Sequence, residues 1–599
     1  MAEAPRAIHR NPQPAPAADP PRWLRLLDAP RWMIALSLLL FGMIYWPTLS
    51  TGFLLDDYLF LLDGKDGSLR PPWDYFNFVP GSHPDTMSAI REGQLAWWTS
   101  PESRIRFFRP LSSLTFWFDF QVFGFRDIYW HLHSMLWGVL YLLAAAAVFY
   151  LVLHRRIAGL ALLMLSLSWT LAPSLFWLSQ RTYLLTGTFG FATLAFWIVN
   201  HRHPTPVRAV AAGIFLLLTM LSGEHGLLAP GGILAWELVH YQGFSRFCRR
   251  LLPVVGLLLA WLGFYISAGF GTANSGVYLS PVNDSAEYLS QLVPRLLVLW
   301  GSLFGSPVRS ISPDAPWLAP AIGTLWMGVT LLLTRRMSQG APAGGAQSLH
   351  WLLVAGMVVM VPLTGTEPID RVVIPGALFG TGLLAWIVGA RFLLPGGHEL
   401  GRLAGFWAVL ILIGNLMMAP LITMGQIRFF NEAQQRFNTA TSRNAVLINQ
   451  SGAKHVVLIN GSGSFAGMYQ PLRMLAYDET GLRVYFISMS EHDMTLLRSG
   501  PDTLDVEIPG HHFIESDGAR LLRHAEDNFS VGQHIEAFPF TVSILATKDG
   551  QPTRVRFHLP SAADHPDWLF LRWDKDTLHP VGIPAPGESL RVPASEKSF

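Results

Sequence analysis

Eleven apolar runs, each long enough to cross a lipid bilayer, limit most strongly what this chain can fold into. A spanning helix needs about 20 mostly apolar residues to cross about 30 Å of hydrocarbon. The runs lie at residues 32–49, 131–153, 157–175, 183–200, 207–223, 226–240, 251–269, 318–334, 351–366, 372–394 and 402–423. They predict a polytopic α-helical membrane protein and argue against a soluble enzyme or a disordered scaffold.

The composition supports this interpretation. Of the 599 residues, 51% are hydrophobic and only 14% are charged, whereas soluble domains carry about 25% charged residues. The net charge of +2 indicates no nucleic-acid partner. Cys248 is the single cysteine and cannot form an internal disulfide, so the fold does not depend on an oxidising compartment. These features fit a bacterial inner-membrane protein.

The arginines between the runs predict the orientation, because cytoplasmic loops carry an excess of Lys and Arg. They gather on one side of the expected membrane: Arg155, Arg156, Arg202, Arg208, Arg246, Arg249, Arg250, Arg335, Arg336, Arg391 and Arg402. The N-terminal tail falls on that cytoplasmic side, and an odd number of spans places the C-terminus outside. A full span at 293–307 would put Arg335 and Arg336 outside, so we expect a re-entrant or surface-lying helix there.

The chain divides into three expected parts: a disordered cytoplasmic tail (1–31), a membrane domain (32–424) with a long outer loop (50–130), and a periplasmic β-sandwich-like domain (425–599). Alternating apolar residues predict its strands, at 455–460, 483–489, 503–508, 539–547 and 553–559. Residues 548–552 predict a hairpin turn between two of them. In the outer loop, the tryptophans suit a helix lying at the membrane interface: Trp73, Trp97, Trp98, Trp117 and Trp130.

Ionisable side chains near the ends of the spans are the informative ones, because burying them in lipid is costly. They all fall on the predicted outer side: Asp56, Asp57, Arg109, Asp119, His131, His133, Arg181, Glu224, His225, Glu367, Asp370 and Arg371. Each has a structural alternative, since an acidic pair can simply end a span and an arginine can extend to lipid headgroups. Their convergence favours a site for an anionic, lipid-linked substrate, because carboxylates transfer protons and arginines bind phosphate.

Several short motifs occur in a fixed order over residues 32–394. They are Asp56-Asp57, Phe-Arg-Pro-Leu-Ser-Ser-Leu (108–114), Tyr-Trp-His-Leu-His (129–133), Trp-Leu-Ser-Gln-Arg (177–181), Gly-Glu-His (223–225) and Asp-Arg-Val-Val-Ile-Pro (370–375). In this order they resemble the GT-C superfamily of integral-membrane glycosyltransferases, especially its protein O-mannosyltransferase-like branches. His133-Ser134 departs from the family pattern, in which an Asn is frequent. The C-terminal β-rich domain also departs from the repeat or trefoil modules of those branches.

The resemblance implies a GT-C-like fold and an inverting transfer of a sugar from a polyprenyl-phosphate carrier to an extracytoplasmic acceptor, which could be a protein, a lipid or a glycan. In the family, an acidic residue of the first outer loop is the general base, a role that falls here on Asp56 or Asp57. The leaving phosphate needs a cation, for which Arg371 and Arg181 are the first candidates and Arg109 the third.

The remaining outer residues are expected to position the substrate: Glu224, His225, Asp119, His131 and His133. No cofactor is certain. A divalent metal stays open, since the oligosaccharyl members of the superfamily use one, and Asp57 and Glu224 are the candidate ligands. The expected partners are the polyprenyl-phosphate-linked sugar, membrane lipids and the extracytoplasmic acceptor.

Three other functions remain open at this point. The same architecture could serve a ligase or polymerase that moves a whole lipid-linked glycan. A transporter or lipid flippase should show charges at mid-membrane and inverted repeats, whereas the charges here lie at one end of the spans. A sensor would need an output domain, for which the short cytoplasmic tail gives no signal.

Overall fold

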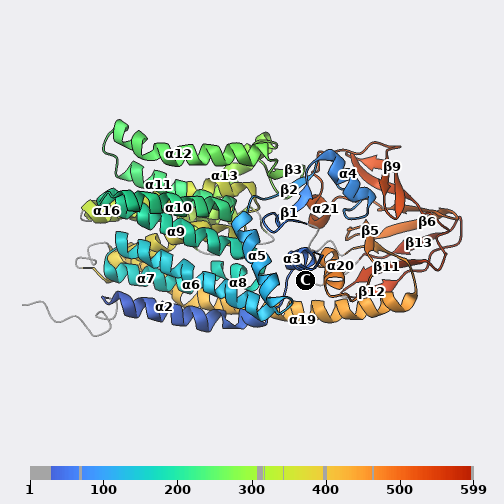
Figure 1. Cartoon of the computed structure of the whole chain (residues 1–599), viewed down its shortest axis with the longest axis horizontal. Helices are drawn as coiled ribbons and strands as arrows, with labels where there is room; N and C mark the ends of the chain where they lie inside the picture. The colour runs from blue at the N-terminus through green and yellow to red at the C-terminus, as the bar shows by residue number, and fades with distance from the viewer. Residues whose placement is uncertain are drawn as a thin grey trace, which may run out of the picture.

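The computed structural model describes residues 28–594, except 67–69, 306–314, 316, 341–342, 395–400, 462–464 and 576. A bundle of long helices forms one end of the molecule, and β-sheets with their covering helices form the other (Figure 1). The polytopic α-helical class and the β-rich C-terminal region are therefore confirmed. Most of the predicted tail, 1–31, lies outside the described residues.

Eight helical segments of the described chain are long and apolar enough to cross a membrane. Four are Pro30–Ser50, which joins α2 (Pro30–Tyr45) and η1 (Trp46–Ser50), α6 (Asp127–Val152), Leu178–Arg202, which joins η3 (Leu178–Gln180) and α9 (Arg181–Arg202), and α12 (Phe244–Ser267). The next three are Leu318–Gln339 in α15 (Leu318–Gly340), Gly344–Gly365 in α16 (Ala343–Met360) and η5 (Val361–Gly365), and Arg371–Phe392 in η6 (Asp370–Gly376) and α17 (Ala377–Phe392). The last is Gly401–Ser451, which joins α18 (Gly401–Leu412), the π-helix η8 (Ile413–Met418) and α19 (Ala419–Ser451). A ninth is present if α7 (Arg155–Ser166) and the segment Trp169–Phe176 (η2 and α8), bent by 45°, form one span.

The expected count of eleven spans is too high. All eleven apolar runs are helical, but α10 (Pro206–Ser222) has 17 residues and α11 (Leu228–Val239) has 12. The chain turns between them through Gly223, whose φ of 150° ends α10, and through the short helix η4 (Glu224–Leu227). This turn divides an apolar stretch into two helices that are short for a bilayer crossing.

The segment expected to be re-entrant or surface-lying belongs to α13 (Ser285–Phe304). Its first half is exposed at Leu289 and Val293, whereas its second half is buried from Leu296 onward. An added Cβ at Gly323 of α15 would lie 2.0 Å from the Leu297 carbonyl oxygen, which shows how closely these two helices pack. The second half of α13 is thus part of the bundle, which excludes a helix lying wholly on its surface.

The first and last spans run in the same direction. Arg156 at the start of α7 forms an ion pair with Asp28, just before α2. The same Arg156 donates to the carbonyl of Leu393, which lies just after α17 and shortly before α18. Farther along, Asn431 of α19 donates to the carbonyl of Pro47, beyond the end of α2. Parallel first and last spans require an odd number of crossings, which agrees with nine.

The outer loop joins the bundle to the β-rich end. It contains α3 (Asp57–Asp66), β1 (Asn77–Pro80), α4 (His83–Arg91), β2 (Arg104–Arg106) and α5 (Pro110–Phe123). Strands β1 and β2 form a small sheet with β3 (Gly271–Ala273), which follows α12. Of the five loop tryptophans, Trp97, Trp98 and Trp130 are buried. The prediction that these tryptophans lie at the membrane interface is therefore wrong for Trp97, Trp98 and Trp130, which pack inside the protein.

Two sheets form the C-terminal region. The six-stranded antiparallel sheet has the order β13 (Ser589–Val592), β6 (Met494–Gly500), β7 (Thr503–Glu507), β10 (Gln551–His558), β9 (Phe540–Lys548) and β8 (His534–Ala537). The four-stranded sheet has the order β12 (Thr577–Pro580), β11 (Trp568–Asp574), β4 (His455–Asn460) and β5 (Val484–Ser488). Strand β4 is parallel to both β11 and β5.

These sheets differ from the expected two-layer sandwich. One face of the four-stranded sheet, with Val457 and Ile459, shares a core with the six-stranded sheet. The other face, with Val456 and Leu458, packs on α19 (Ala419–Ser451) and α20 (Phe465–Ala476). Helices α19 and α20 thus form a third layer. The parallel pairing of β4 and β5 explains it, because α20 makes the crossover between these strands and covers one face of the sheet.

Helix α19 has 33 residues and continues past residue 425, the expected domain boundary. It leaves the bundle and continues along the β-rich end (Figure 1). Gln434 donates to the Phe53 carbonyl and to the Tyr58 hydroxyl, and Asn444 accepts from the backbone of Leu578. The helix persists because its polar half has partners in both the outer loop and the sheets.

The predicted hairpin is confirmed, with Lys548 paired to Gln551 across a two-residue turn. Asp549 and Gly550 have φ values of 51° and 77°. Positive φ at both central residues is the type I′ geometry that suits the twist of a hairpin.

Gly550→Ala should destabilise the β-rich end. A non-glycine residue in left-handed backbone costs about 1–2 kcal/mol, and the added Cβ would lie 1.9 Å from the side-chain oxygen of Asn528. The thermal unfolding of the purified protein measures the effect. Gly481→Ala is the matched control, because nothing lies within 4 Å of its added Cβ. Equal unfolding temperatures for the two variants would contradict this explanation of the turn.

Candidate active site

The acidic pair lies at the junction of the bundle and the β-rich end. Asp56 immediately precedes α3 and is partly exposed, whereas Asp57 is the first residue of α3 and is fully buried. Leu55, just before the pair, has a φ of 47°. A branched residue in this conformation costs of order 1–3 kcal/mol and persists only where its surroundings impose it.

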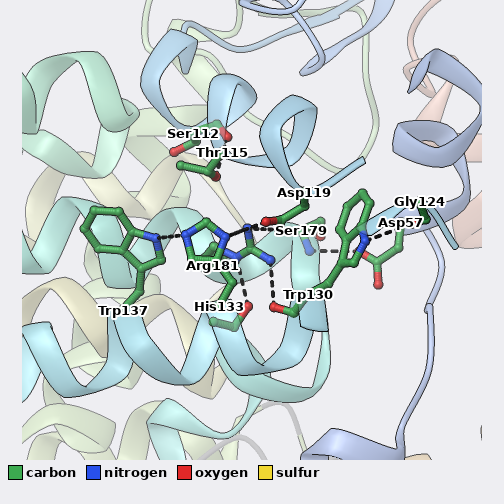
Figure 2. Close-up of polar contacts among 11 residues, drawn as sticks. Asp57, Ser112, Thr115, Asp119, Gly124, Trp130, His133, Trp137, Ser179 and Arg181 are labelled. Carbon is green, nitrogen blue, oxygen red and sulfur yellow. Dashed lines mark hydrogen bonds and ion pairs between the residues drawn. The ribbon is translucent and has the colours of Figure 1, made fainter. Parts of the chain in front are cut away.

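Asp57 is occupied by backbone contacts. Its two oxygens accept from the N–H groups of Leu54 and Ser179, each at 2.8 Å, and Figure 2 shows the second of these bonds. Burial raises the pKa of Asp57 to about 8, although the backbone N–H groups oppose the rise. This raised pKa favours the protonated form of the carboxyl group at neutral pH, and both of its oxygens already accept backbone N–H groups. Its contacts fasten the outer loop to the segment before α9.

Asp56 contacts the β-rich end. The hydroxyl of Tyr469 on α20 donates a hydrogen bond to its carboxylate. Burial raises the pKa of Asp56, whereas this hydrogen bond and the charges of Arg371 and Arg109 lower it. Burial also raises the pKa of Tyr469 well above its ordinary value, and the negative charge of Asp56 adds to this effect. Tyr469 therefore stays protonated and remains a donor.

Arg371 lies in the 3-10 helix η6 (Asp370–Gly376), directly before α17. Its guanidinium carbon lies 4.7 Å from the ring centroid of Trp177, so the indole face holds the side chain. Among the described residues, Arg371 forms no ion pair at salt-bridge distance, although its charge acts on Asp56. The contact with Trp177 thus fixes the position of the Arg371 guanidinium, and its N–H groups can donate hydrogen bonds to an anion.

Arg109 is fixed by Glu224. Its Nε donates to one oxygen of Glu224 at 2.9 Å, and its guanidinium lies 4.4 Å from the Phe107 ring centroid. The other oxygen of Glu224 accepts from the backbone of Phe108 at 2.8 Å and from the hydroxyl of Tyr265 at 3.2 Å. Since only Nε of Arg109 is bound to Glu224, the outer edge of its guanidinium can contact a further anion.

Tyr278, on the connection after β3, completes what we call the charged cluster. Burial raises the pKa of its hydroxyl, and the charges of Arg371 and Arg109 act against the rise. The charged cluster consists of Asp56, the side chains that interact with it and the partner of one of them: Asp56, Tyr278, Tyr469, Arg371, Arg109 and Glu224, which is paired with Arg109. Its six members come from six segments of the chain, which meet where the helix bundle adjoins the β-rich end.

Arg181 and its partners form a separate buried network (Figure 2). Arg181 is fully buried and pairs with Asp119 at 2.5 Å. It also donates to Ser134 at 2.8 Å and to the Trp130 carbonyl at 3.0 Å. All three guanidinium nitrogens of this buried side chain therefore donate within the protein, which argues against a role in binding phosphate.

His133 extends this network. Its Nδ1 lies 2.5 Å from Asp119, and its Nε2 accepts from the indole N–H of Trp137 at 3.0 Å. These partners fix the tautomer with the proton on Nδ1. His131 is buried between the carbonyls of Leu175 and Gly52, at 2.9 Å each. The side chains of Asp119, His131 and His133 thus form hydrogen bonds with other residues of the chain.

His225 lies nearer to the charged cluster. Its ring stacks on Tyr183 with the centroids 3.9 Å apart, and its Nδ1 is buried without a hydrogen-bond partner among the described residues. Burial lowers the pKa of His225 well below its ordinary value, helped by the charges of Arg109 and Arg371. The imidazole is therefore neutral, with a ring nitrogen available to a substrate hydroxyl.

The candidate metal ligands do not fit a divalent cation. Both oxygens of Asp57 accept backbone N–H groups, and both oxygens of Glu224 already accept hydrogen bonds, one of them from Arg109. A cation would have to replace these donors and lie beside a guanidinium. We therefore derive no step through a metal at these residues.

Tyr469 and Tyr278 are the members of the cluster that the sequence did not indicate. Neither lies in a motif, and Tyr469 belongs to the predicted periplasmic domain, far along the chain from the acidic pair. Helix α20 was also not predicted, so nothing in the local pattern placed Tyr469 near the membrane.

Comparisons with known proteins give matches only among solved structures. No protein-family model matches the chain, and no curated protein does. The apo oligosaccharyltransferase of Archaeoglobus fulgidus matches with 12% identity and a TM-score of 0.40, over 76% of this chain and 64% of that one. The archaeal oligosaccharyltransferase AglB from Archaeoglobus fulgidus, in complex with an inhibitory peptide and a dolichol-phosphate, matches with 11% identity and a TM-score of 0.38, over 78% of this chain and 64% of that one.

ArnT from Cupriavidus metallidurans, bound to undecaprenyl phosphate, matches with 15% identity and a TM-score of 0.36, over 78% of this chain and 86% of that one. This chain spans less than two thirds of the length of the oligosaccharyltransferase. At these identities and TM-scores, the matches assign no function to this chain.

Arg181→Met should strongly destabilise the helix bundle. The substitution leaves Asp119 buried without its cation, and breaking a buried ion pair costs about 3–5 kcal/mol. The thermal stability of the detergent-solubilised protein, followed by size-exclusion chromatography, measures the loss. Arg428→Ala removes an exposed ion pair with Glu432 and should change little. An Arg181→Met protein as stable as the wild type would disprove the structural role.

Proposed function

We propose that this chain is an integral-membrane glycosyltransferase of the GT-C type, which transfers a sugar from a polyprenyl-phosphate carrier to an extracytoplasmic acceptor. The observation that carries the proposal is the contrast within the acidic pair. Asp57 is occupied by backbone N–H groups, while Asp56 is partly exposed and coupled to the charges of Arg371 and Arg109. A carboxylate beside two held arginines suits transfer from a phosphate leaving group.

Asp56 is the general base in this proposal. It removes the proton from an acceptor hydroxyl as the acceptor oxygen bonds to the anomeric carbon of the sugar. The bond from this carbon to the phosphate oxygen breaks, so the configuration inverts and polyprenyl phosphate leaves. The raised pKa of Asp56 moves it toward neutral pH, where a general base is more effective.

Arg371 and Arg109 stabilise the leaving phosphate. Trp177 holds Arg371, and Glu224 holds Arg109, so little reorganisation is needed as negative charge develops on the phosphate. His225 and Tyr278 are placed to contact sugar hydroxyls. Arg181, Asp119, His131 and His133 shape the surrounding helices and stay outside the reaction.

The orientation follows from the positive-inside rule. The arginines between the spans support a cytoplasmic position for one end of the bundle, and the charged cluster lies at the other end, beside the sheets. The protein would thus lie in a bacterial inner membrane, with its N-terminal side cytoplasmic and its β-rich end periplasmic.

Asp56→Asn should lower sugar transfer about 10²–10⁴-fold, because an amide cannot accept the proton. The assay follows transfer from undecaprenyl-phosphate sugars to an envelope extract in proteoliposomes. In the same assay, Arg371→Ala should weaken the binding of undecaprenyl phosphate. The mass of the product separates the transfer of one sugar from that of a whole glycan.

The neighbouring Asp57→Asn is the matched variant. Its amide N–H₂ would face one backbone N–H donor, so it should lower stability by about 1–3 kcal/mol, while the folded fraction keeps transferring sugar. The proposal fails if Asp56→Asn transfers sugar like the wild type. It also fails if folded Asp57→Asn protein alone loses activity.

Tyr469→Phe should move the acid limb of the pH–rate profile to higher pH. Asp56 acts only when ionised, so transfer rises as the pH increases through its pKa. The Tyr469 hydrogen bond favours the ionised form, and its loss therefore raises that pKa. Tyr477→Phe, just beyond the same helix, is the control. A uniform loss of activity with an unmoved limb would show that Tyr469 acts only through packing.

A further inference from the structure

A second cluster of polar side chains lies in the β-rich end, apart from the charged cluster. His492 lies on the connection between β5 and β6, and His511 and Glu515 lie between β7 and the short helix α21 (Asp517–Leu521). Nε2 of His492 and Nδ1 of His511 lie 2.8 Å and 3.0 Å from the same oxygen, Oε2 of Glu515. All three side chains are partly exposed, so ions can reach them from solution.

The spacing of these atoms matches a metal site. Two ligand atoms bound to one tetrahedral Zn²⁺, at metal–nitrogen distances of 2.0–2.1 Å, lie about 3.3 Å apart. The atoms of His492, His511 and Glu515 all lie within 4.8 Å of one another. Small side-chain rotations would therefore bring all three around one ion.

His512 holds the carboxylate in place. Its backbone N–H donates to Oε1 of Glu515 at 3.1 Å, which leaves Oε2 directed at the two histidines. The Nδ1 of His512 itself accepts from the backbone of Ile514 at 3.3 Å, so its Nε2 carries the proton and is not a ligand. This arrangement is typical of the outer contacts that orient metal ligands.

The two histidines converge on one carboxylate oxygen. Their rings are stacked, with the centroids 3.5 Å apart and the planes at 10°, and each presents a nitrogen to Oε2 of Glu515. The exposed rings can tilt apart so that both nitrogens point at one ion.

We propose that His492, His511 and Glu515 bind a first-row transition-metal ion, with Zn²⁺ as the expected occupant. Two imidazoles and one carboxylate suit Zn²⁺, whereas Mg²⁺ and Ca²⁺ prefer sites made of oxygen. Three protein ligands leave a fourth position for water. This inference does not depend on the proposed transferase function.

The ion would join two connections of the β-rich end close to its contact with the bundle. Helix α21 follows Glu515 directly, and the carbonyl of Arg520 in α21 accepts from the backbone of Gly276 at 2.8 Å. Gly276 lies two residues before Tyr278 of the charged cluster. Metal binding should therefore raise the thermal stability of the chain, because the ion binds the folded form.

The test uses the full-length protein, purified in detergent with an affinity tag that contains no histidine and treated with a chelator. Zn²⁺ is titrated by calorimetry, and Co²⁺ is titrated by visible absorption, which reports four-coordinate geometry. The variants are His492→Ala, His511→Ala and Glu515→Gln. His579→Ala, on β12 of the same region, is the matched control.

The expected result is one Zn²⁺ per chain, bound at least tenfold more weakly by each ligand variant and equally well by His579→Ala. Mg²⁺ and Ca²⁺ should not displace it, and Zn²⁺ should raise the unfolding temperature of the wild type only where the three ligands are intact. Circular dichroism and a monodisperse elution profile confirm that each variant is folded. Equal Zn²⁺ binding by the wild type and the folded ligand variants, or no binding by either, would overturn the proposal.

Discussion

The carboxyl group of Asp57 fastens the outer loop to the helix bundle, and the arrangement of the site depends on this contact. It accepts hydrogen bonds from the backbone N–H groups of Leu54 and Ser179, which the chain separates by the outer loop, the span α6 and the bent pair of α7 with Trp169–Phe176. Because neighbouring residues at the start of a helix point about 100° apart, holding Asp57 inward turns Asp56 outward. The buried residue of the pair thus orients the exposed one.

The basic residues show the same contrast between a buried structural side chain and an accessible one. Arg181 is enclosed by Asp119, Ser134 and a carbonyl group, and it holds helices together. Arg371 rests on the indole face of Trp177 and forms no ion pair with another of the described residues. Two arginines at the same end of the bundle therefore have different roles. The burial of each side chain and its hydrogen-bond partners determine which role it has.

Much of the architecture could be predicted from the sequence, because apolar length and β-alternation are local properties. The eleven apolar runs are all helical, and the five predicted strands match β4, β5, β7, β9 and β10. The count of spans was too high because the two apolar runs on either side of Gly223 form helices of only 17 and 12 residues. The mixed sheet was missed because parallel pairing joins β4 and β11, which are more than a hundred residues apart.

The candidate site was predictable only in part. The motifs brought together Asp56, Arg109, Glu224 and Arg371, which share the outer ends of the helices. The motifs could not show that Arg371 and Arg181 have different roles, because the roles depend on contacts with residues far away in the sequence. Tyr469 carried no signal at all, since its role depends on how a late helix lies against an early loop.

The bond between Tyr469 and Asp56 joins positions 413 residues apart. During synthesis, Asp56 leaves the ribosome long before Tyr469 is made, and every spanning helix is complete before α20 exists. The membrane part is therefore inserted while its carboxylate still lacks this tyrosine. The site is finished only when the last region folds back onto α3, so an interrupted chain can be inserted in the membrane without carrying a completed site.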